Sequence, residues 1–283
     1  MEYLVAVVEE GSFTRAAQRA GISQATLSHQ VRELERTVGQ PLLERLPGAV
    51  LLTPMGRAYL PHAAAALRSV REAQRGGAEP ARLRIATLFS IALGILPPAI
   101  RAWGAEHPEV EIEVRDFPNL DELIAHMALG VTDLAVGPRP RAWPGTVRVI
   151  GTEELVVVLG ADDPLAGAAT LRLEQLADRP WILYAPENAL ARLVERACEA
   201  AGFTPRAAVR TRHTATAVSL AAAGLGAALA PESIIEADLD AAVLRPDPPV
   251  RRELVALATP GSGALAEGFV DLLATRGAAG FRR

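Results

Sequence analysis

The sequence has a single cysteine, no lysine and no long apolar run. Cys198 alone cannot form an internal disulfide or complete a zinc site, which is typical of a protein in a reducing cytoplasm. No segment approaches the ~18 consecutive apolar residues that a transmembrane helix needs. The first ten residues lack a basic region and include Glu9 and Glu10, so we expect no signal peptide. These absences favour a cytoplasmic protein without a membrane partner.

What is present is typical of a folded globular protein. The 283 residues are 50% hydrophobic and 22% charged, which excludes a disordered or fibrous chain and allows about two domains. The net charge of −4 argues against a nucleic-acid binder. Residues 1–82, however, hold ten arginines and eight acidic residues, a charge of about +2, so the negative charge lies in the remainder. This asymmetry is too weak to identify a partner by itself.

Helix boundaries are strongly marked in the first forty residues. Gly11-Ser12 interrupts an opening helix, and Ser12 is a good N-cap for a helix whose apolar residues recur at positions 13, 16, 17 and 20. Gly21 can end that helix in the left-handed conformation. Ser23 then caps a longer helix that ends before Gly39. Two short helices joined by a tight turn predict a helix-turn-helix.

The longer of these helices has one apolar and one polar face. The apolar stripe consists of Leu27, Val31, Leu34 and Val38. The polar face is small or hydrogen-bonding near its start and basic farther along, with Gln24, Ala25, Ser28, His29, Arg32 and Arg36. That order suits a recognition helix, because its first turns meet base edges in the major groove and later arginines meet phosphates. An ordinary solvated helix face is the alternative.

A short hairpin is predicted after this helix. Residues 41–45 and 50–53 are two extended arms around a turn at 46–49, and such a hairpin is the wing of a winged helix-turn-helix. Thr53 then caps a new helix with Pro54 at its first position. We therefore assign residues 1–55 to a winged helix-turn-helix DNA-binding domain.

Over about fifty residues these motifs resemble the LysR-type transcriptional regulators. The matching residues are Gly11-Ser12-Phe13-Thr14-Arg15-Ala16-Ala17, Ile22-Ser23-Gln24, Leu27-Ser28, Leu34-Glu35, Gly39, Leu43-Glu44-Arg45 and Leu52-Thr53-Pro54 with Gly56. The resemblance implies side chains near bases at Gln24, Ala25, Ser28 and His29, and near the DNA backbone at Thr14, Arg15, Arg32 and Arg45. It also implies an interrupted palindromic operator in double-stranded DNA, a homodimer or homotetramer, and RNA polymerase as a partner if the protein is an activator.

The sequence departs from the family pattern at three places. The family has several more residues before the position of Met1, so we expect either a shortened first helix or a start that was placed late in the sequence. Ala25 and His29 stand where the family commonly has Pro and Arg, so the base contacts there should differ. The hairpin tip at 46–49 lacks the usual basic residues, which predicts a weak minor-groove contact.

A long alanine-rich helix is predicted after the hairpin. Its seam positions alternate at three- and four-residue steps, the period of paired helices, and they are Leu60, Ala63, Leu67, Val70 and Gln74. Pro61 should kink this helix. The resemblance implies that the helix pairs two subunits, and a helix lying on its own domain is the alternative. Residues 75–80 are rich in glycine, so we assign 56–80 to a linker helix and hinge.

Strands and helices alternate beyond the linker. The predicted strands are 83–86, 110–114, 133–136, 155–159, 181–183, 209–210 and 227–230, and the predicted helices are 90–106, 120–129, 190–201 and 214–223. This pattern predicts an α/β fold with a mainly parallel sheet, preceded by the all-α winged helix-turn-helix. The resemblance extends here through Gly130, Asp133-Leu134-Ala135-Val136, Asp163-Pro164-Leu165 and Ala223-Gly224-Leu225-Gly226.

Residues 81–283 are predicted to form an effector-binding domain of two α/β subdomains. Chain crossings near Gly160 and Pro260 would let the subdomains hinge around a cleft, as in periplasmic binding proteins. We assign subdomain I to about 81–158 and 260–283, and subdomain II to about 159–259.

Candidate ligand-binding residues lie where predicted strands end. Ligands of open α/β sheets bind beyond the carboxyl ends of strands, often at helix N-termini. These positions hold Ser90, Arg139, Glu187, His213 and Thr214, and the resemblance implies that matching positions line an effector pocket. Ser90, at the start of a helix, should hydrogen-bond an effector oxygen. Arg139, His213 and two helix N-termini favour an organic anion, whereas Glu187 disfavours one; for each residue an ordinary cap or loop position is the alternative.

No catalytic or cofactor motif is evident. Gly224-Leu225-Gly226 follows a predicted helix and precedes a strand, the wrong order for a dinucleotide-binding turn. The five histidines lack metal-ligand spacing, and there is no Ser/His/Asp or Cys/His arrangement. We therefore expect no cofactor, no metal and no enzymatic activity. Cys198 lies in a predicted helix whose apolar face includes Leu190, Leu193, Val194 and Ala197, which favours a buried cysteine over the alternative, a redox switch. The resemblance also implies that a peroxide-sensing member of the family would need a second cysteine, which this sequence lacks.

The sequence thus predicts a ligand-responsive transcription regulator. Effector binding would close the cleft and shift the placement of subunits on DNA. A solute-binding protein of a transporter is one alternative, which the N-terminal helix-turn-helix disfavours. An α/β enzyme is the other, which the missing catalytic set disfavours.

Overall fold

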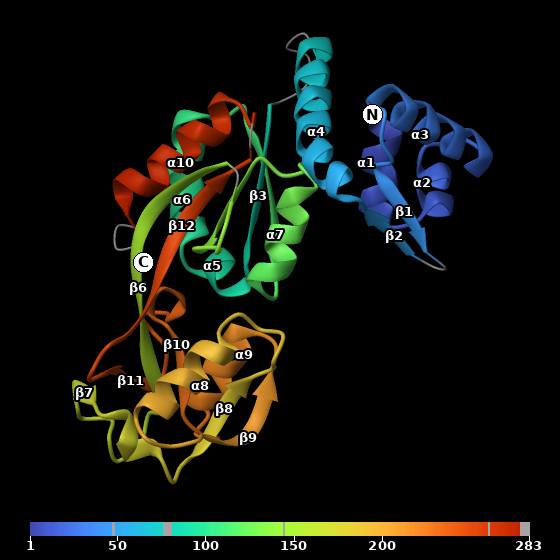
Figure 1. The fold of residues 1–283 in the computed structure, drawn as a ribbon. Coiled ribbons are helices and arrows are strands. Elements are labelled where there is room, and N and C mark those ends of the chain that lie inside the picture. The colour runs from blue at the N-terminus through green and yellow to red at the C-terminus, as the bar shows by residue number, and fades with distance from the viewer. Residues whose placement is uncertain (47–48, 76–80, 144, 260, 278–283) are drawn as a thin grey trace.

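The structure is a computed structural model that describes residues 1–283 except 47–48, 76–80, 144, 260 and 278–283, without the side chains of residues 45, 46, 49, 68, 69 and 71–75. A small N-terminal domain, one long helix and a larger C-terminal domain follow one another along the chain (Figure 1). The long helix α4 stands between the other two parts. None of the helices that the structure describes has both the length and the apolar character needed to span a bilayer.

The N-terminal domain is a winged helix-turn-helix. It consists of α1 (Glu2–Glu10), α2 (Phe13–Arg19), α3 (Gln24–Val38), β1 (Leu43–Leu46) and β2 (Ala49–Leu52), and α4 (Pro54–Arg75) follows. β1 and β2 pair antiparallel. Ser12 Oγ accepts a hydrogen bond from the Arg15 N–H at 3.4 Å, and Ser23 Oγ accepts one from the Thr26 N–H at 3.1 Å. The expected helix caps and the hairpin are therefore confirmed.

Helix α4 packs against its own chain more than the sequence suggested. Leu60 is 1% exposed and lies in the core of the N-terminal domain with Leu4, Val7 and Leu27. Ala63 is also buried, whereas Val70 is 51% exposed. The expected seam is therefore wrong at Leu60 and Ala63, because contacts within the chain already cover these two residues.

The C-terminal domain alternates strands and helices along the chain. Its elements are β3 (Arg82–Leu88), α5 (Phe89–Leu93), α6 (Leu96–Glu106), β4 (Glu111–Phe117), α7 (Leu120–Ala128), β5 (Leu134–Pro138), β6 (Thr146–Gly160), β7 (Thr170–Leu171), η1 (Leu173–Leu176), β8 (Pro180–Tyr184), α8 (Ala191–Ala200), β9 (Arg206–Thr211), α9 (Thr214–Ala222), β10 (Ala228–Pro231), η2 (Glu232–Ile234), β11 (Ala241–Pro246), β12 (Val250–Ala258) and α10 (Ala264–Arg276). Two separate clusters of buried apolar side chains show that it has two subdomains.

The main sheet is mixed rather than mainly parallel. Its strand order is β4-β3-β5-β12-β6-β11-β7, with β10 also pairing to β6 and with β8 and β9 forming a separate parallel pair. β3 runs parallel to β4 and β5, whereas β12 is antiparallel to both β5 and β6. The long strands β6 and β12 carry the chain between the subdomains (Figure 1).

The crossings between subdomains lie inside these two strands. Residues 254–258 of β12 pair with β5 in subdomain I, while Val250 pairs with Leu155, which in turn pairs with Pro231 of subdomain II. The chain therefore crosses within β6 and near the start of β12, earlier than the expected boundaries at 158–160 and 259–260. Pro260 itself lies outside the described residues.

One predicted helix is interrupted. Residues 90–106 were expected to form a single helix, but the structure has α5 and α6 with a break between Leu93 and Leu96. Pro97 and Pro98 lie in the first turn of α6, where proline is tolerated because the N–H groups there have no partner within the helix. Helix α5 also begins one residue before Ser90.

Candidate functional sites

The start of α3 presents an exposed polar face. Gln24 and Ala25 occupy its first two positions and are exposed, as are His29 and Arg32 farther along. His29 Nε2 lies 3.8 Å from Glu33 Oε1, and the Arg32 Nε–H donates to the Ser28 carbonyl at 3.3 Å. Helix α1 contacts both α3 and α4, and α3 lies on the side of α1 away from α4 and the C-terminal domain (Figure 1). This face is free to meet a large partner.

Ser28 does not belong to this exposed face. Its side chain was expected beside Gln24 and His29, but the residue is only 7% exposed. It lies next to Leu27, which is fully buried in the core of the N-terminal domain. Ser28 therefore sits at the border between the polar face and the core.

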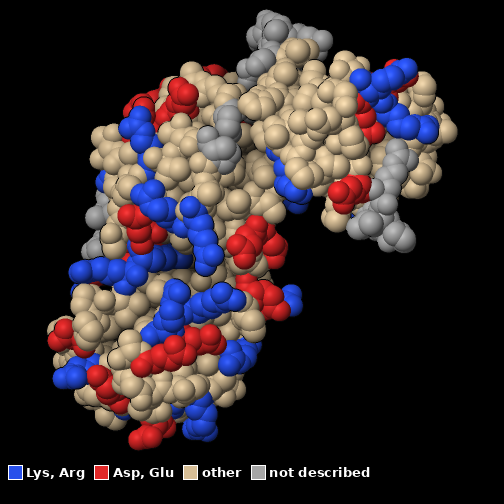
Figure 2. Space-filling view, viewed as in Figure 1, with Lys and Arg blue, Asp and Glu red and all other residues tan. Residues whose placement is uncertain are grey.

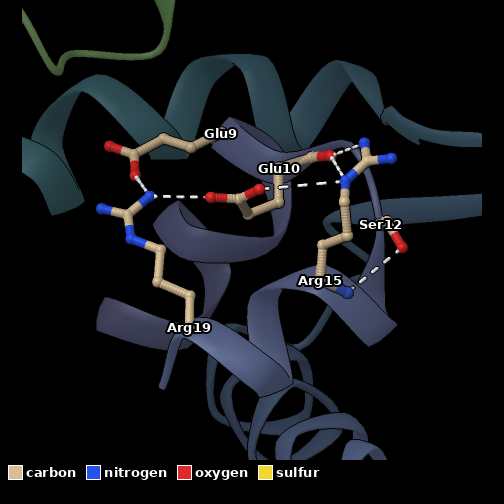
Figure 3. Close-up of polar contacts among 5 residues, drawn as sticks. All are labelled: Glu9, Glu10, Ser12, Arg15 and Arg19. Atoms are coloured by element: carbon tan, nitrogen blue, oxygen red, sulfur yellow. Dashed lines mark hydrogen bonds and ion pairs between the residues drawn. The ribbon is translucent and has the colours of Figure 1, made fainter. Parts of the chain in front are cut away.

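The two arginines of α2 turn back onto α1 (Figure 3). The Arg15 guanidinium donates from Nε to the backbone carbonyl of Glu10 at 3.1 Å, which satisfies the end of α1. Arg19 Nη1 binds Glu9 Oε2 at 2.6 Å and Glu10 Oε1 at 3.1 Å, and these bonds raise the pKa of Arg19. Arg15 is thus engaged within the domain, although its side chain is 65% exposed.

The two remaining predicted backbone contacts are placed by their elements. Thr14 is exposed in the first turn of α2. Arg45 lies on β1 opposite Val50, and its side chain is outside the described part of the chain. Both lie on the elements that flank α3 in a winged helix-turn-helix.

Positive and negative side chains are interspersed on the face of the molecule that Figure 2 shows. In the N-terminal domain, Arg36 pairs with Glu33 on the same face of α3. Residues 1–55 hold five arginines and six acidic residues, so the N-terminal domain has a formal charge of −1, and the positive surplus of residues 1–82 comes from residues 56–82. The shape of the domain is therefore more informative than its electrostatics.

The cleft between the subdomains is bridged by direct contacts. The ring of Phe89, the first residue of α5, lies 5.5 Å from that of His213, which precedes α9. The Ala189 N–H donates to the Pro118 carbonyl at 2.7 Å, and Asn119 Nδ2 donates to the Glu187 carbonyl at 3.3 Å. These contacts join the starts of α5 and α7 in subdomain I to subdomain II.

Ser90 takes part in a buried polar network at the floor of the cleft. Arg252 Nη2 donates to Ser90 Oγ at 2.8 Å, and Arg252 Nε donates to Glu153 Oε2 at 2.6 Å. Ser233 Oγ, from η2, donates to Glu153 Oε1. The network therefore joins α5, β6, β12 and η2 where the chain crosses between subdomains.

Thr214 is the first residue of α9, directly after His213. It is 1% exposed, and its Oγ1 has no hydrogen-bond partner among the described residues. Because Phe89 and His213 are in contact, the residues that follow them, Ser90 and Thr214, lie on facing helix starts. A buried hydroxyl without a partner is unfavourable unless a bound group satisfies it.

Two of the predicted ligand-binding residues point elsewhere. Arg139 Nε pairs with Glu253 Oε1 at 2.7 Å. Glu253 and Arg252 are consecutive in β12, so their side chains lie on opposite faces of the sheet, and Arg139 is not brought together with Ser90. The Glu187 carboxylate is exposed, 4.0 Å from Arg212, and only its backbone carbonyl takes part in bridging the cleft.

Two cavities in the described part of the chain lie away from these residues. One of about 470 Å³ opens between α1, α4, α7 and the strands β3 and β4, and another of about 410 Å³ lies in subdomain II beside Gly160 and Gly224. Neither is lined by the five predicted ligand-binding residues. A ligand that reaches Ser90 and Thr214 must therefore separate the contacts that bridge the cleft.

Sequence reasoning missed the charged pair at the cleft floor. Glu153 and Arg252 are separated by 99 positions in the chain and become neighbours only through the pairing of β6 with β12. The sequence did contain one signal. Glu153-Glu154 directly precedes an apolar run, and Arg251-Arg252 is separated from the next apolar run only by Glu253. Charged residues beside such runs are often paired in the folded protein.

The single cysteine is buried in α8. Burial raises the pKa of the Cys198 thiol to about 12, helped by the nearby Glu195 and Glu199. Among the described residues, no group of three His, Cys, Asp or Glu side chains is arranged to hold a metal ion.

Comparison with known families finds two matching models that together cover nearly the whole chain. The bacterial regulatory helix-turn-helix model of the lysR family matches residues 1–57. The LysR substrate binding domain model matches residues 76–278.

Individual proteins with similar sequences are transcription regulators. The probable hydrogen peroxide-inducible genes activator of Mycobacterium avium is 31% identical over 238 residues, covering 82% of this chain and 76% of that protein. The regulator BudR of Raoultella terrigena is 31% identical over 258 residues, covering 83% and 84%. A full-length OxyR variant from Pseudomonas aeruginosa has the same fold, with a TM-score of 0.73 at 23% identity over 97% of this chain and 92% of that one.

Proposed function

The chain belongs to the LysR-type transcriptional regulators, and on that basis we propose that α3 reads double-stranded DNA while the cleft around Ser90 and Thr214 binds the controlling small molecule. As a member of this family it is a transcription regulator with a DNA-binding and an effector-binding domain, rather than the solute-binding protein of a transporter. We propose that it acts in the cytoplasm and carries out no catalysis.

The DNA-reading residues are those that α3 exposes at its start. Gln24 can form two hydrogen bonds to adenine, and the small Ala25 leaves room for a thymine methyl group. His29 lies one turn farther along, and Arg32 is close enough to the helix start to meet phosphate. Thr14 and Arg45 would contact the backbone from α2 and the wing, and Arg15 would do so only by leaving the Glu10 carbonyl.

The observation that carries the effector site is the buried, unpartnered hydroxyl of Thr214, which follows His213 at the place where His213 meets Phe89, the residue before Ser90. A ligand oxygen between the two helix starts would satisfy it, and His213 and Phe89 would have to separate to admit that ligand. Because these contacts already join the subdomains, effector binding would separate them and stabilise a second arrangement, rather than close the cleft as the sequence predicted.

The effector-binding domain approaches the linker helix closely at Gly130 and at Gly261. A methyl group added at Gly130 would lie 2.6 Å from Ala64 Cβ and 3.2 Å from Pro61 Cα, and Leu129 packs against the N-terminal core. Gly130 follows α7, whose start is joined to subdomain II through Pro118 and Asn119. Movement at the cleft can therefore reach α4 through α7. Through α4 it would change the arrangement of a dimer or tetramer bound to an interrupted palindrome. RNA polymerase would be a further partner if the protein is an activator.

Replacing Thr214 by Val tests the effector site. The Thr214 hydroxyl has no partner among the described residues, so Thr214→Val should leave the melting temperature nearly unchanged. It should weaken the response to an effector by roughly tenfold or more, because a bound oxygen loses its partner. The measurements are a small-molecule thermal-shift screen on the full chain, followed by gel shifts with DNA flanking the gene.

Thr259→Val is the matched control. Thr259 Oγ1 donates to the Thr132 carbonyl at 2.9 Å, away from the cleft. That variant should melt lower and respond to the effector as the wild type does. An effector that titrates Thr214→Val and wild type equally would place the site elsewhere.

A further inference from the structure

The floor of the cleft holds a buried ion pair of its own. Arg252 and Glu153 are directly opposite each other on β12 and β6, and they are 8% and 5% exposed. Their closest atoms are 2.6 Å apart, and Ser233 and Ser90 hydrogen-bond the outer sides of the pair. The guanidinium therefore already has a carboxylate in the position that an anionic ligand would otherwise take.

The charges at this place balance. Among the described residues, Asp133, Glu153 and Arg252 are the buried charged residues, and Asp133 lies elsewhere, accepting a hydrogen bond from the Arg84 backbone. Tyr184, which lies within electrostatic reach of Arg252, stays neutral because burial raises its pKa. One positive and one negative charge remain, so a second carboxylate would be buried without a counter-charge.

The unsatisfied groups that remain around this pair are hydrogen-bond donors or hydroxyls. Arg252 Nη1 is buried and has no partner among the described residues, and the same holds for Thr214 Oγ1. The Ser90 hydroxyl accepts from Arg252, so its own proton is available to donate. Such a set complements a carbonyl, amide or hydroxyl oxygen.

We propose that Glu153 determines the charge of the effector: by balancing Arg252 it makes the cleft select an uncharged oxygen acceptor and exclude small carboxylates. This inference rests on the proposed effector site at Ser90 and Thr214. It replaces the organic anion that the sequence favoured through Arg139, His213 and two helix N-termini; of these, Arg139 pairs with Glu253 instead.

Acetate rescue of a Glu153→Ala variant tests the charge balance. Removing the Glu153 side chain leaves Arg252 buried without a counter-charge and opens space for a small anion, so the variant should melt below wild type. Acetate should then raise its melting temperature by about 2–5 °C more than chloride at equal ionic strength, and acetamide should not. Wild type should show no such preference for acetate.

Glu154→Ala is the matched control. Glu154 pairs with Arg251 across the same two strands, at 2.7 Å, on the exposed face of the sheet. Acetate should stabilise that variant no more than chloride does. Equal rescue of both variants, or rescue of neither, would overturn the proposal.

The isosteric variant Glu153→Gln measures selectivity without opening a cavity. Ligand-observed NMR on the full chain should show wild type binding acetamide at least about tenfold better than acetate, and Glu153→Gln should reverse the order. Wild type that binds acetate as well as acetamide, with loss of both in Thr214→Val, would refute the charge selection while supporting the effector site. Acetate rescue of Glu153→Ala, together with an effector response unchanged in Thr214→Val, would instead support the charge balance and refute the site.

Discussion

At the scale of single residues, exposure decides which side chains of α3 can read a base. Gln24 is exposed at the helix start, while Ser28 is 7% exposed. Gln24→Ala should therefore cost about 1–3 kcal/mol of specific DNA affinity and relax the preference at one base pair. Arg32→Ala should weaken binding to all sequences and reduce the salt dependence by roughly one unit of slope.

Ser28→Ala is the control for both variants. Because Ser28 lies at the border of the core, its replacement should leave base preference unchanged. Gel shifts on DNA flanking the gene, with single-base substitutions and at several salt concentrations, separate the three effects. If Gln24→Ala keeps full base preference while Ser28→Ala loses it, the reading face is turned toward Ser28.

Cys198 bears on the relative named as a hydrogen peroxide-inducible activator. With its pKa raised to about 12 by burial, the thiol of Cys198 is almost entirely protonated at neutral pH, and the thiolate is the reactive form. Iodoacetamide should therefore label the native protein far more slowly than the unfolded chain, whose cysteine pKa is about 8.5.

Peroxide should also leave DNA binding unchanged in both wild type and Cys198→Ala. The checks are labelling followed by mass spectrometry and gel shifts after peroxide treatment. A peroxide response present in wild type and absent from Cys198→Ala would contradict the buried-thiol argument.

At the scale of elements, the sequence predicts what local signals determine. Ser12, Ser23 and Gly39 mark the ends of α2 and α3 within a few residues, because helix caps act through adjacent backbone groups. The break between α5 and α6 was also encoded locally, in Pro97-Pro98, but the apolar pattern on both sides suggested one helix. Strands β11 and β12 and helix α10 were not predicted, although β12 supplies the floor of the cleft.

Pairing between distant strands was beyond what the sequence could predict. The register of β6 against β12 places Glu153 opposite Arg252, and the neighbouring side chain of Glu253 lies on the other face of the sheet. Ser90 therefore joins the network through Arg252, whereas Arg139 pairs with Glu253 on the opposite face. A shift of one residue would exchange the two faces of the strand. The residues at the ends of predicted strands therefore indicated the region of the cleft. Which of them belong to the polar network depended on the strand register, which the sequence does not specify.

At the scale of the whole molecule, α4 packs against its own chain, and we propose that it also pairs with a second copy. Periodicity predicted one apolar seam, but Leu60 and Ala63 are buried within the chain. The exposed side of the helix instead carries Ala58, His62, Ala66 and Val70, one residue per turn. We therefore propose this side of α4 as the face that pairs two subunits.

Replacing Val70 by Asp tests that pairing face. Val70 is 51% exposed in the isolated chain, so Val70→Asp should fold normally. In a dimer the new carboxylate would be buried against the partner helix at a cost of several kcal/mol, so sedimentation at micromolar concentration should show smaller species. Leu60→Asp is the contrasting variant, because it places a charge in the N-terminal core and should lower the melting temperature whatever the assembly. Val70→Asp that sediments like wild type would mean that the subunits associate through other surfaces, since the substitution reaches no side chain of the chain's own core.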